Sequence, residues 1–135
     1  MIGLDTNVLV RYLAQDDAKQ AALATRLVEK QLSIGAPGFI SLVVLVELCW
    51  VLQRLYSATS VELVTTVEDL LGTPQFRIER RDVVQAVLRQ INSAKAGKAG
   101  FADVLIAKLA ESEGCTRTLT FDKLGARFSG MTLLD

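Results

Sequence analysis

The sequence contains no histidine, and this absence removes whole classes of enzyme mechanism. Catalysis by Ser-His-Asp or Cys-His arrangements is excluded, as is any ribonuclease mechanism that needs a histidine base. The commonest zinc ligand is also missing. Acid–base or metal chemistry in this chain must therefore use other side chains, and its 15 Asp and Glu residues are the natural candidates.

Cysteines are few, and long hydrophobic runs are absent. Cys49 and Cys115 are far apart in sequence and form neither a metal-ligand pair nor a disulfide framework, which fits a reducing cytosol. We predict that both are structural, with Cys49 a small core residue. The apolar stretch 39–52 is too short to span a bilayer and contains Glu47. No signal peptide is visible, so we expect a soluble, cytoplasmic protein without a membrane partner.

An excess of one charge is lacking as well. The 15 Lys and Arg residues balance the 15 Asp and Glu residues, giving a formal net charge of zero. This balance argues against a protein that coats nucleic acid by charge alone. Half of the 135 residues are hydrophobic, which is enough for the core of one compact domain.

Short apolar runs alternate with longer helical patterns along the chain. Strands are predicted at residues 2–4, 39–40, 76–78, 117–121 and 131–134. Helices are predicted at residues 6–14, 16–32, 61–71, 82–92 and 101–112, and Ser41 is expected to cap a further helix that carries Glu47. Asp16 or Asp17 is expected to cap the second of these helices, and Asp82 the helix that it begins. Strands that alternate with helices predict an α/β fold with a mainly parallel sheet.

Four carboxylates lie beside or inside apolar runs without a local basic partner: Asp5, Glu47, Asp103 and Asp122. Acids are almost never fully buried unless they are paired or bind a metal. Asp5 and Asp122 follow predicted strands, and Asp103 lies in the first turn of its helix, so topology favours one sheet edge for all three. Glu47 lies near the middle of a predicted buried helix. A shared hard cation, Mg²⁺ or Mn²⁺, is the simplest partner for such a set.

Each acid also has an interpretation without a ligand. Asp5 would cap the helix that follows it, and Asp103 would favour the dipole of its own helix. Asp122 would occupy an ordinary turn, and Glu47 would pair with a distant arginine such as Arg11. The joint interpretation is favoured because all four lack local partners. Carboxylate-bound cations promote phosphodiester hydrolysis, and this chemistry needs no histidine.

Four blocks of residues, in this order, resemble the PIN-domain nucleases. They are Asp5-Thr6-Asn7-Val8-Leu9, Ser41 ahead of Glu47-Leu48, Phe101-Ala102-Asp103-Val104-Leu105-Ile106-Ala107, and Leu119-Thr120-Phe121-Asp122. The resemblance covers essentially the whole chain, and its compact length is similar to the VapC-type toxins of toxin–antitoxin pairs. It implies a three-layer α/β/α PIN-like fold in a single domain, residues 1–135, and a Mg²⁺- or Mn²⁺-dependent endoribonuclease.

The same resemblance implies roles for residues and the kinds of partner. The catalytic acids would be Asp5, Glu47, Asp103 and Asp122, and the metal ligands among them would be Asp5 and Asp103. Three positions match polar residues that support the pocket in the family: Thr6, Asn7 and Thr120. The implied partners are an RNA substrate, a second subunit in a homodimer, and a cognate antitoxin whose C-terminal segment lies across the pocket.

Phosphate contacts are expected from basic residues. Lys95 and Lys98 are favoured because they flank the helix of Asp103 in a loop of small residues, and Arg11 is a third candidate. Each can instead be a solvated surface charge, and so can the further candidates Arg77, Arg80 and Arg81. Trp50 and Tyr56 can stack on bases, but core or dimer packing is the favoured interpretation.

Three other functions fit parts of the pattern. An aspartate-phosphorylating phosphatase would need a second acid where Asn7 stands, and a receiver domain would need a lysine after the last strand. A non-catalytic interaction module with a PIN fold would not need an intact set of acids. A PIN nuclease in RNA processing or decay would differ from a toxin in lacking an antitoxin gene immediately upstream.

Overall fold

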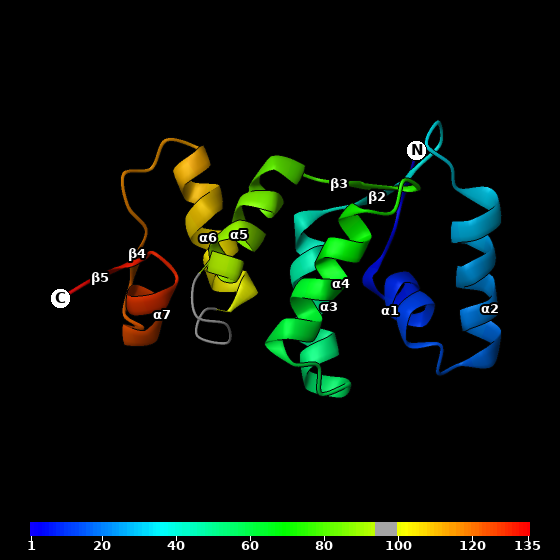
Figure 1. Cartoon of the computed structure of the whole chain (residues 1–135), viewed down its shortest axis with the longest axis horizontal. Coiled ribbons are helices and arrows are strands. Elements are labelled where there is room, and N and C mark those ends of the chain that lie inside the picture. The colour runs from blue at the N-terminus through cyan, green and yellow to red at the C-terminus, as the bar shows by residue number, and fades with distance from the viewer. Residues whose placement is uncertain (94–99) are drawn as a thin grey trace. The chain divides into compact units, whose positions relative to one another are not determined.

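The computed structural model describes residues 1–93 and 100–135, and these residues form two compact units. Unit 1 comprises Met1–Thr59 and Thr65–Glu79, and unit 2 comprises Ser60–Val64 and Arg80–Asp135. Figure 1 follows the elements along the chain. Among the described residues, none of the helices combines the length and the hydropathy that a membrane span requires.

Unit 1 contains a three-stranded parallel sheet. Its strands are β1 (Ile2–Gly3), β2 (Gly38–Ile40) and β3 (Phe76–Ile78), in the order β1-β2-β3. Gly3 is in register with Phe39, and Ile40 with Ile78. Because parallel neighbours need a crossover connection, helices separate these strands in the sequence. The helix-rich chain with this parallel sheet confirms the predicted α/β class and the predicted three-layer α/β/α fold.

The helices of unit 1 begin where the sequence provides caps. They are α1 (Thr6–Ala14), α2 (Ala18–Arg26) and α3 (Leu42–Leu55). The carboxylate of Asp17 accepts a hydrogen bond from the Gln20 amide at 2.9 Å, and the Ser41 hydroxyl accepts one from the Val44 amide at 3.1 Å. Both caps agree with the sequence prediction.

The predicted helix 16–32 is wrong at its end. After α2 the chain continues as a π-helix, η1 (Leu27–Gln31), closed by the Leu32 amide, which donates to the Leu27 carbonyl at 2.9 Å. The wider turn takes one more residue per hydrogen-bonded ring than an α-helix does. Hydrophobic periodicity does not reveal one extra residue in a final turn, because the buried Val28 still faces inward.

Unit 2 is built from α5 (Arg81–Ser93), α6 (Phe101–Ser112) and α7 (Lys123–Phe128), with β4 (Leu119–Thr120) and β5 (Thr132–Leu133) paired in parallel. Helix α4 (Ser60–Leu71) begins in unit 2 and ends in unit 1. Helix α5 packs against α6, and the valines Val84, Val87 and Val104 are fully buried. Asp82 lies in the first turn of α5 rather than before it, which corrects its predicted position as the N-cap.

Candidate functional site

Asp5 stands at the N-cap position of α1, but its side chain does not cap the helix. Its backbone is extended and its carboxylate accepts no capping hydrogen bond. Asn7 Nδ2 lies 3.5 Å from Asp5 Oδ2, at the outer limit of a hydrogen bond. The other aspartate N-caps behave differently, since Asp17 and Asp122 both accept from the first turns of their helices. The exposed carboxylate of Asp5 is therefore available to another partner.

Glu47 is exposed on α3, which corrects the prediction that it lies in a buried helix. Only one face of α3 is buried, through Leu45, Leu48 and Leu52. The hydroxyl of Thr6, itself 3% exposed on α1, donates a short hydrogen bond to Glu47 Oε1. Glu47 is thus held by a neutral donor, and the alternative pairing with Arg11 does not occur. Thr6, which follows Asp5 in the chain, links the start of α1 to Glu47.

Asp103 and Asp122 lie in unit 2 and differ in their surroundings. Asp103 is half-buried in the first turn of α6, and its carboxylate has no hydrogen bond or ion pair with any other described residue. Asp122 accepts from the Leu124 amide at 2.9 Å, and its own amide donates to Thr120 Oγ1 at 3.0 Å. Asp122 is thus the N-cap of α7, and the cap uses Oδ1 and leaves Oδ2 free of it.

Each unit contributes two of the four acids. In residues 1–93 and 100–135, no group of three or more Cys, Asp or Glu side chains is close enough to hold a metal ion. The donor set nevertheless suits a hard cation, because Asp5 and Asp103 offer carboxylate oxygens that neither cap a helix nor pair with a base.

The PIN-domain family model matches residues 2–129, a range that includes all four acids. The chain belongs to the PIN domain family. PIN domains are generally nucleases, which are hydrolases, and they usually use divalent metal ions. No curated protein matches the chain.

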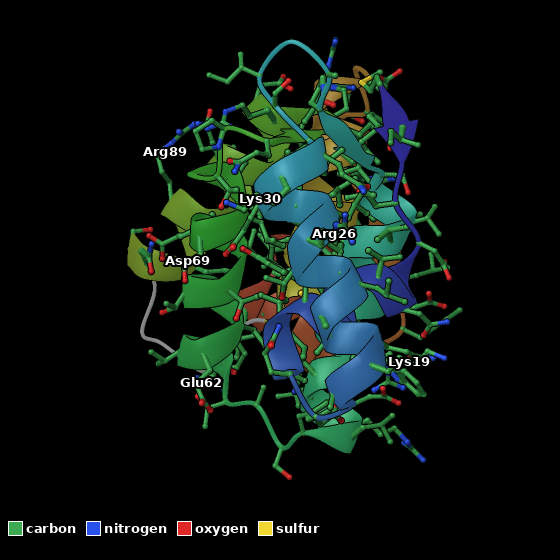
Figure 2. The ribbon with its side chains drawn as sticks, turned by 90° about the vertical axis from the view of Figure 1, so that its right-hand side faces the viewer. Lys19, Arg26, Lys30, Glu62, Asp69 and Arg89 are labelled. Carbon is green, nitrogen blue, oxygen red and sulfur yellow. The ribbon has the colours of Figure 1, made fainter. Side chains whose placement is uncertain are left out.

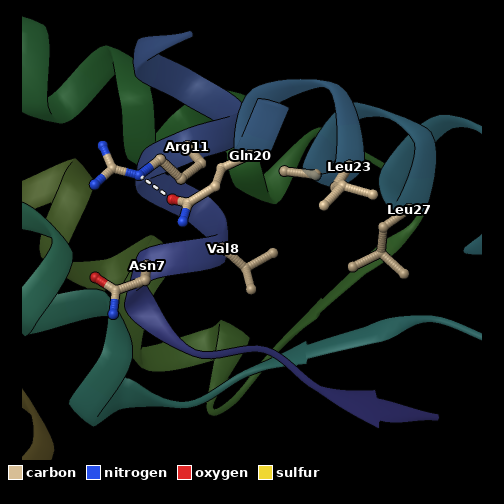
Figure 3. A pocket seen from close by; sticks show the side chains of 7 residues that line it. Asn7, Val8, Arg11, Gln20, Leu23 and Leu27 are labelled. Atoms are coloured by element: carbon tan, nitrogen blue, oxygen red, sulfur yellow. Dashed lines mark hydrogen bonds between the residues drawn. The ribbon is translucent and has the colours of Figure 1, made fainter. Parts of the chain in front are cut away.

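Next to Asn7, this PIN domain has a groove between α1 and α2. Its volume is about 300 Å³, and it is lined by Asn7, Val8, Arg11, Gln20, Leu23, Ala24 and Leu27. Arg11 Nε donates to Gln20 Oε1 at 2.8 Å and so joins the two helices, as the dashed line in Figure 3 shows. The remaining lining is mostly apolar, so the groove lacks the acids that would bind a cation.

Arg11 would have to give up its contacts with Asp16 or Gln20 to bind a phosphate. Its Nη1 lies 3.1 Å from Asp16 Oδ1, while the hydroxyl of Tyr56 donates to Asp16 Oδ2 at 2.6 Å. The hydrogen bond from Tyr56, aided by Arg11, lowers the pKa of Asp16. These three side chains connect the start of α2 to the ends of α1 and α3. The sequence shows the charge of Arg11, which made it a candidate phosphate contact, but not this pairing.

The other basic candidates fall into three groups. Lys95 and Lys98 lie outside the described residues. Arg80 is paired with Asp82 at 3.4 Å and with Glu113 at 3.0 Å. Arg77 is exposed and free of ion pairs with the rest of the described chain. The sequence analysis missed a further group of basic side chains on α2 and η1. These are Lys19, Arg26 and Lys30, whose spacing of seven and four residues is visible in the sequence.

The two cysteines have opposite environments, and the predicted core position of Cys49 is confirmed. Cys49 is 6% exposed, and burial raises the pKa of its thiol to about 12. Cys115 is exposed. Because the thiolate is the reactive form, we expect Ellman's reagent to modify Cys115 quickly and Cys49 only after unfolding. Two fast-reacting thiols in the native protein would contradict this assignment, and Cys115→Ser identifies which thiol reacts.

Proposed function

We propose that this PIN domain is a metal-dependent endoribonuclease and the toxin of a toxin–antitoxin pair. The observation that supports the nuclease most directly is the uncommitted carboxylate of Asp5. Of the aspartates at N-cap positions of described helices, Asp5 alone leaves its helix uncapped. Capping typically contributes about 1 kcal/mol, so a carboxylate that forgoes it is consistent with a different ligand.

In this proposal Asp5 and Asp103 hold Mg²⁺ or Mn²⁺ through their carboxylate oxygens. A cation held there would supply a water molecule of lowered pKa and would offset negative charge on the phosphodiester. Glu47 and Asp122 complete the acidic set. The hydroxyl of Thr6 orients Glu47 by holding Oε1, which leaves Oε2 without a donor among the described residues. Asn7 supports the carboxylate of Asp5 directly, whereas the Thr120 hydroxyl accepts from the backbone amide of Asp122 and so holds the chain at that acid.

The toxin role rests on the resemblance to the VapC-type toxins, within a family match that covers residues 2–129. The partners that go with it are RNA, a cognate antitoxin and a second subunit. Large apolar side chains on α3 support the homodimer, since Val43 is 78%, Trp50 56% and Leu55 70% exposed. A short antitoxin gene immediately upstream would separate the toxin from a PIN nuclease of RNA processing or decay.

Cleavage of total cellular RNA by the purified protein tests the nuclease. We expect discrete fragments with Mg²⁺ or Mn²⁺ and none with a chelator or with the Asp5→Asn variant. The matched control is Asp69→Asn, which removes an exposed helical carboxylate far from the family blocks and should cleave normally. Equal cleavage by wild type and Asp5→Asn, or cleavage that persists in chelator, would refute the proposal.

A further inference from the structure

Three basic side chains form one line along the outer face of α2 and η1. Lys19, Arg26 and Lys30 are separated by seven and four residues, so they fall within about 40° of one another around a helix axis. All three are exposed, whereas the opposite face buries Ala21 and Val28. Figure 2 shows the three labelled residues following one another along this helical segment. We call Lys19, Arg26 and Lys30 the basic line.

The basic line is not neutralised within the described part of the chain. None of its members makes an ion pair or a hydrogen bond there, unlike Arg11, Arg80 and Lys108. The acids at the start of α2 are committed elsewhere, because Asp17 caps the helix and Asp16 binds Tyr56 and Arg11. Glu29 lies within the same segment but forms no ion pair with the line, so three solvent-facing cations stand against one acid there.

The length and chemistry of the basic line fit a nucleic-acid strand. Eleven residues separate Lys19 from Lys30, which is about 16 Å along a helix axis. A line of this length is long enough for its three cations to contact more than one phosphate of a single strand. Basic stripes along a helix are the usual electrostatic footprint of nucleic-acid binding. Protein interfaces, in contrast, are depleted in lysine and enriched in aromatic residues, and α2 carries no aromatic residue.

We infer that the basic line binds the phosphate backbone of single-stranded RNA, as a contact surface in unit 1 separate from the carboxylates. The inference rests on the proposed endoribonuclease for its choice of RNA. Lysine and arginine here act as charges on flexible stems, so they hold the backbone without reading its sequence. The line would therefore raise affinity for any RNA strand and leave the choice of cleavage site to other residues.

Filter binding of a short single-stranded RNA in chelator tests the basic line without hydrolysis. The test variant is Lys19→Gln/Arg26→Gln/Lys30→Gln. The control is Arg54→Gln/Arg89→Gln/Arg117→Gln, which removes three exposed cations from other elements and gives the same net charge. We expect the test variant to lower the slope of log affinity against log salt by about 2, at roughly 0.7 per contact, and to weaken binding about 100-fold at 0.1 M salt. Circular dichroism verifies that both variants are folded.

The outcomes separate this inference from the proposed function. If the test variant binds RNA as tightly as wild type, or no more weakly than the control variant, the inference that the basic line binds RNA is wrong even if the protein cleaves RNA. If the test variant has the lower slope of log affinity against log salt but the wild-type protein never cleaves RNA, RNA binding by the basic line is supported and the proposed nuclease activity is refuted. If polyglutamate binds wild type more tightly than RNA does and only that binding is lost in the variant, the line is a protein-docking surface and the inference fails. With Mg²⁺ present, the variant should raise KM and leave kcat unchanged.

Discussion

Replacing Asp103 with asparagine is expected to reduce metal-dependent RNA cleavage by about a thousandfold. Asparagine keeps the shape of the side chain but removes the charge that a cation needs. A metal ligand of this kind supports several kcal/mol of transition-state stabilisation, and each 1.36 kcal/mol corresponds to roughly a tenfold change in rate. Single-turnover cleavage of a defined RNA substrate with Mg²⁺ would measure the loss.

The fold should survive this substitution, which distinguishes a metal ligand from a structural acid. The Asp103 carboxylate has no hydrogen bond or ion pair with the other described residues, so the main stabilising effect of its charge is on the dipole of α6, worth at most about 1 kcal/mol. Thermal unfolding in chelator should therefore be nearly the same for wild type and Asp103→Asn. Full activity in the variant would contradict the assignment, and a large fall in melting temperature would make Asp103 a structural residue.

Replacing Leu48 with alanine is expected to lower the free energy of unfolding by about 3 kcal/mol, because it leaves a cavity in the core. Leu48 is 0% exposed and lies on the buried face of α3, next to Glu47. For a chain of this size the change corresponds to roughly a 10 °C fall in melting temperature. Urea unfolding monitored by circular dichroism would measure it.

The same helix provides the matched control. Leu55 is 70% exposed on α3, so Leu55→Ala removes the same atoms without leaving a cavity. Measured at concentrations where the protein is monomeric, its free energy of unfolding should change by less than about 0.5 kcal/mol. If the two variants were equally destabilised, the orientation of α3 described above would be wrong, and the exposure of Glu47 would be wrong with it.

Much of the fold was predictable because helix ends are marked by local chemistry. The predicted bounds 6–14 and 101–112 match α1 and α6, and the caps at Asp17 and Ser41 were both expected. The strands at residues 117–121 and 131–134 are only two residues long as paired elements, since pairing depends on a partner strand and not on local apolar content. The π-helical turn at the end of α2 had no signal in the pattern.

The site was predictable in its residues but not in their surroundings. The positions of Asp5 and Asp122 after strands follow from the alternation of elements. The sequence does not show whether an aspartate at an N-cap position caps its helix. Asp5 and Asp17 look equivalent in the sequence, but only Asp17 accepts a capping hydrogen bond. The exposure of Glu47 was missed because α3 is apolar on nearly all sides, so its sequence does not show which face is buried.

The exposed face of α3 has a spectroscopic consequence. Trp50 is the only tryptophan in the chain, and it stands one turn after Glu47 with the Arg54 guanidinium 5.4 Å from its ring. Its emission in the native protein should already be red-shifted by water, so unfolding will change the wavelength little. Quenching of that emission by iodide will instead report whether a ligand or a second protein covers α3, which gives the molecule an intrinsic probe beside one of its acids.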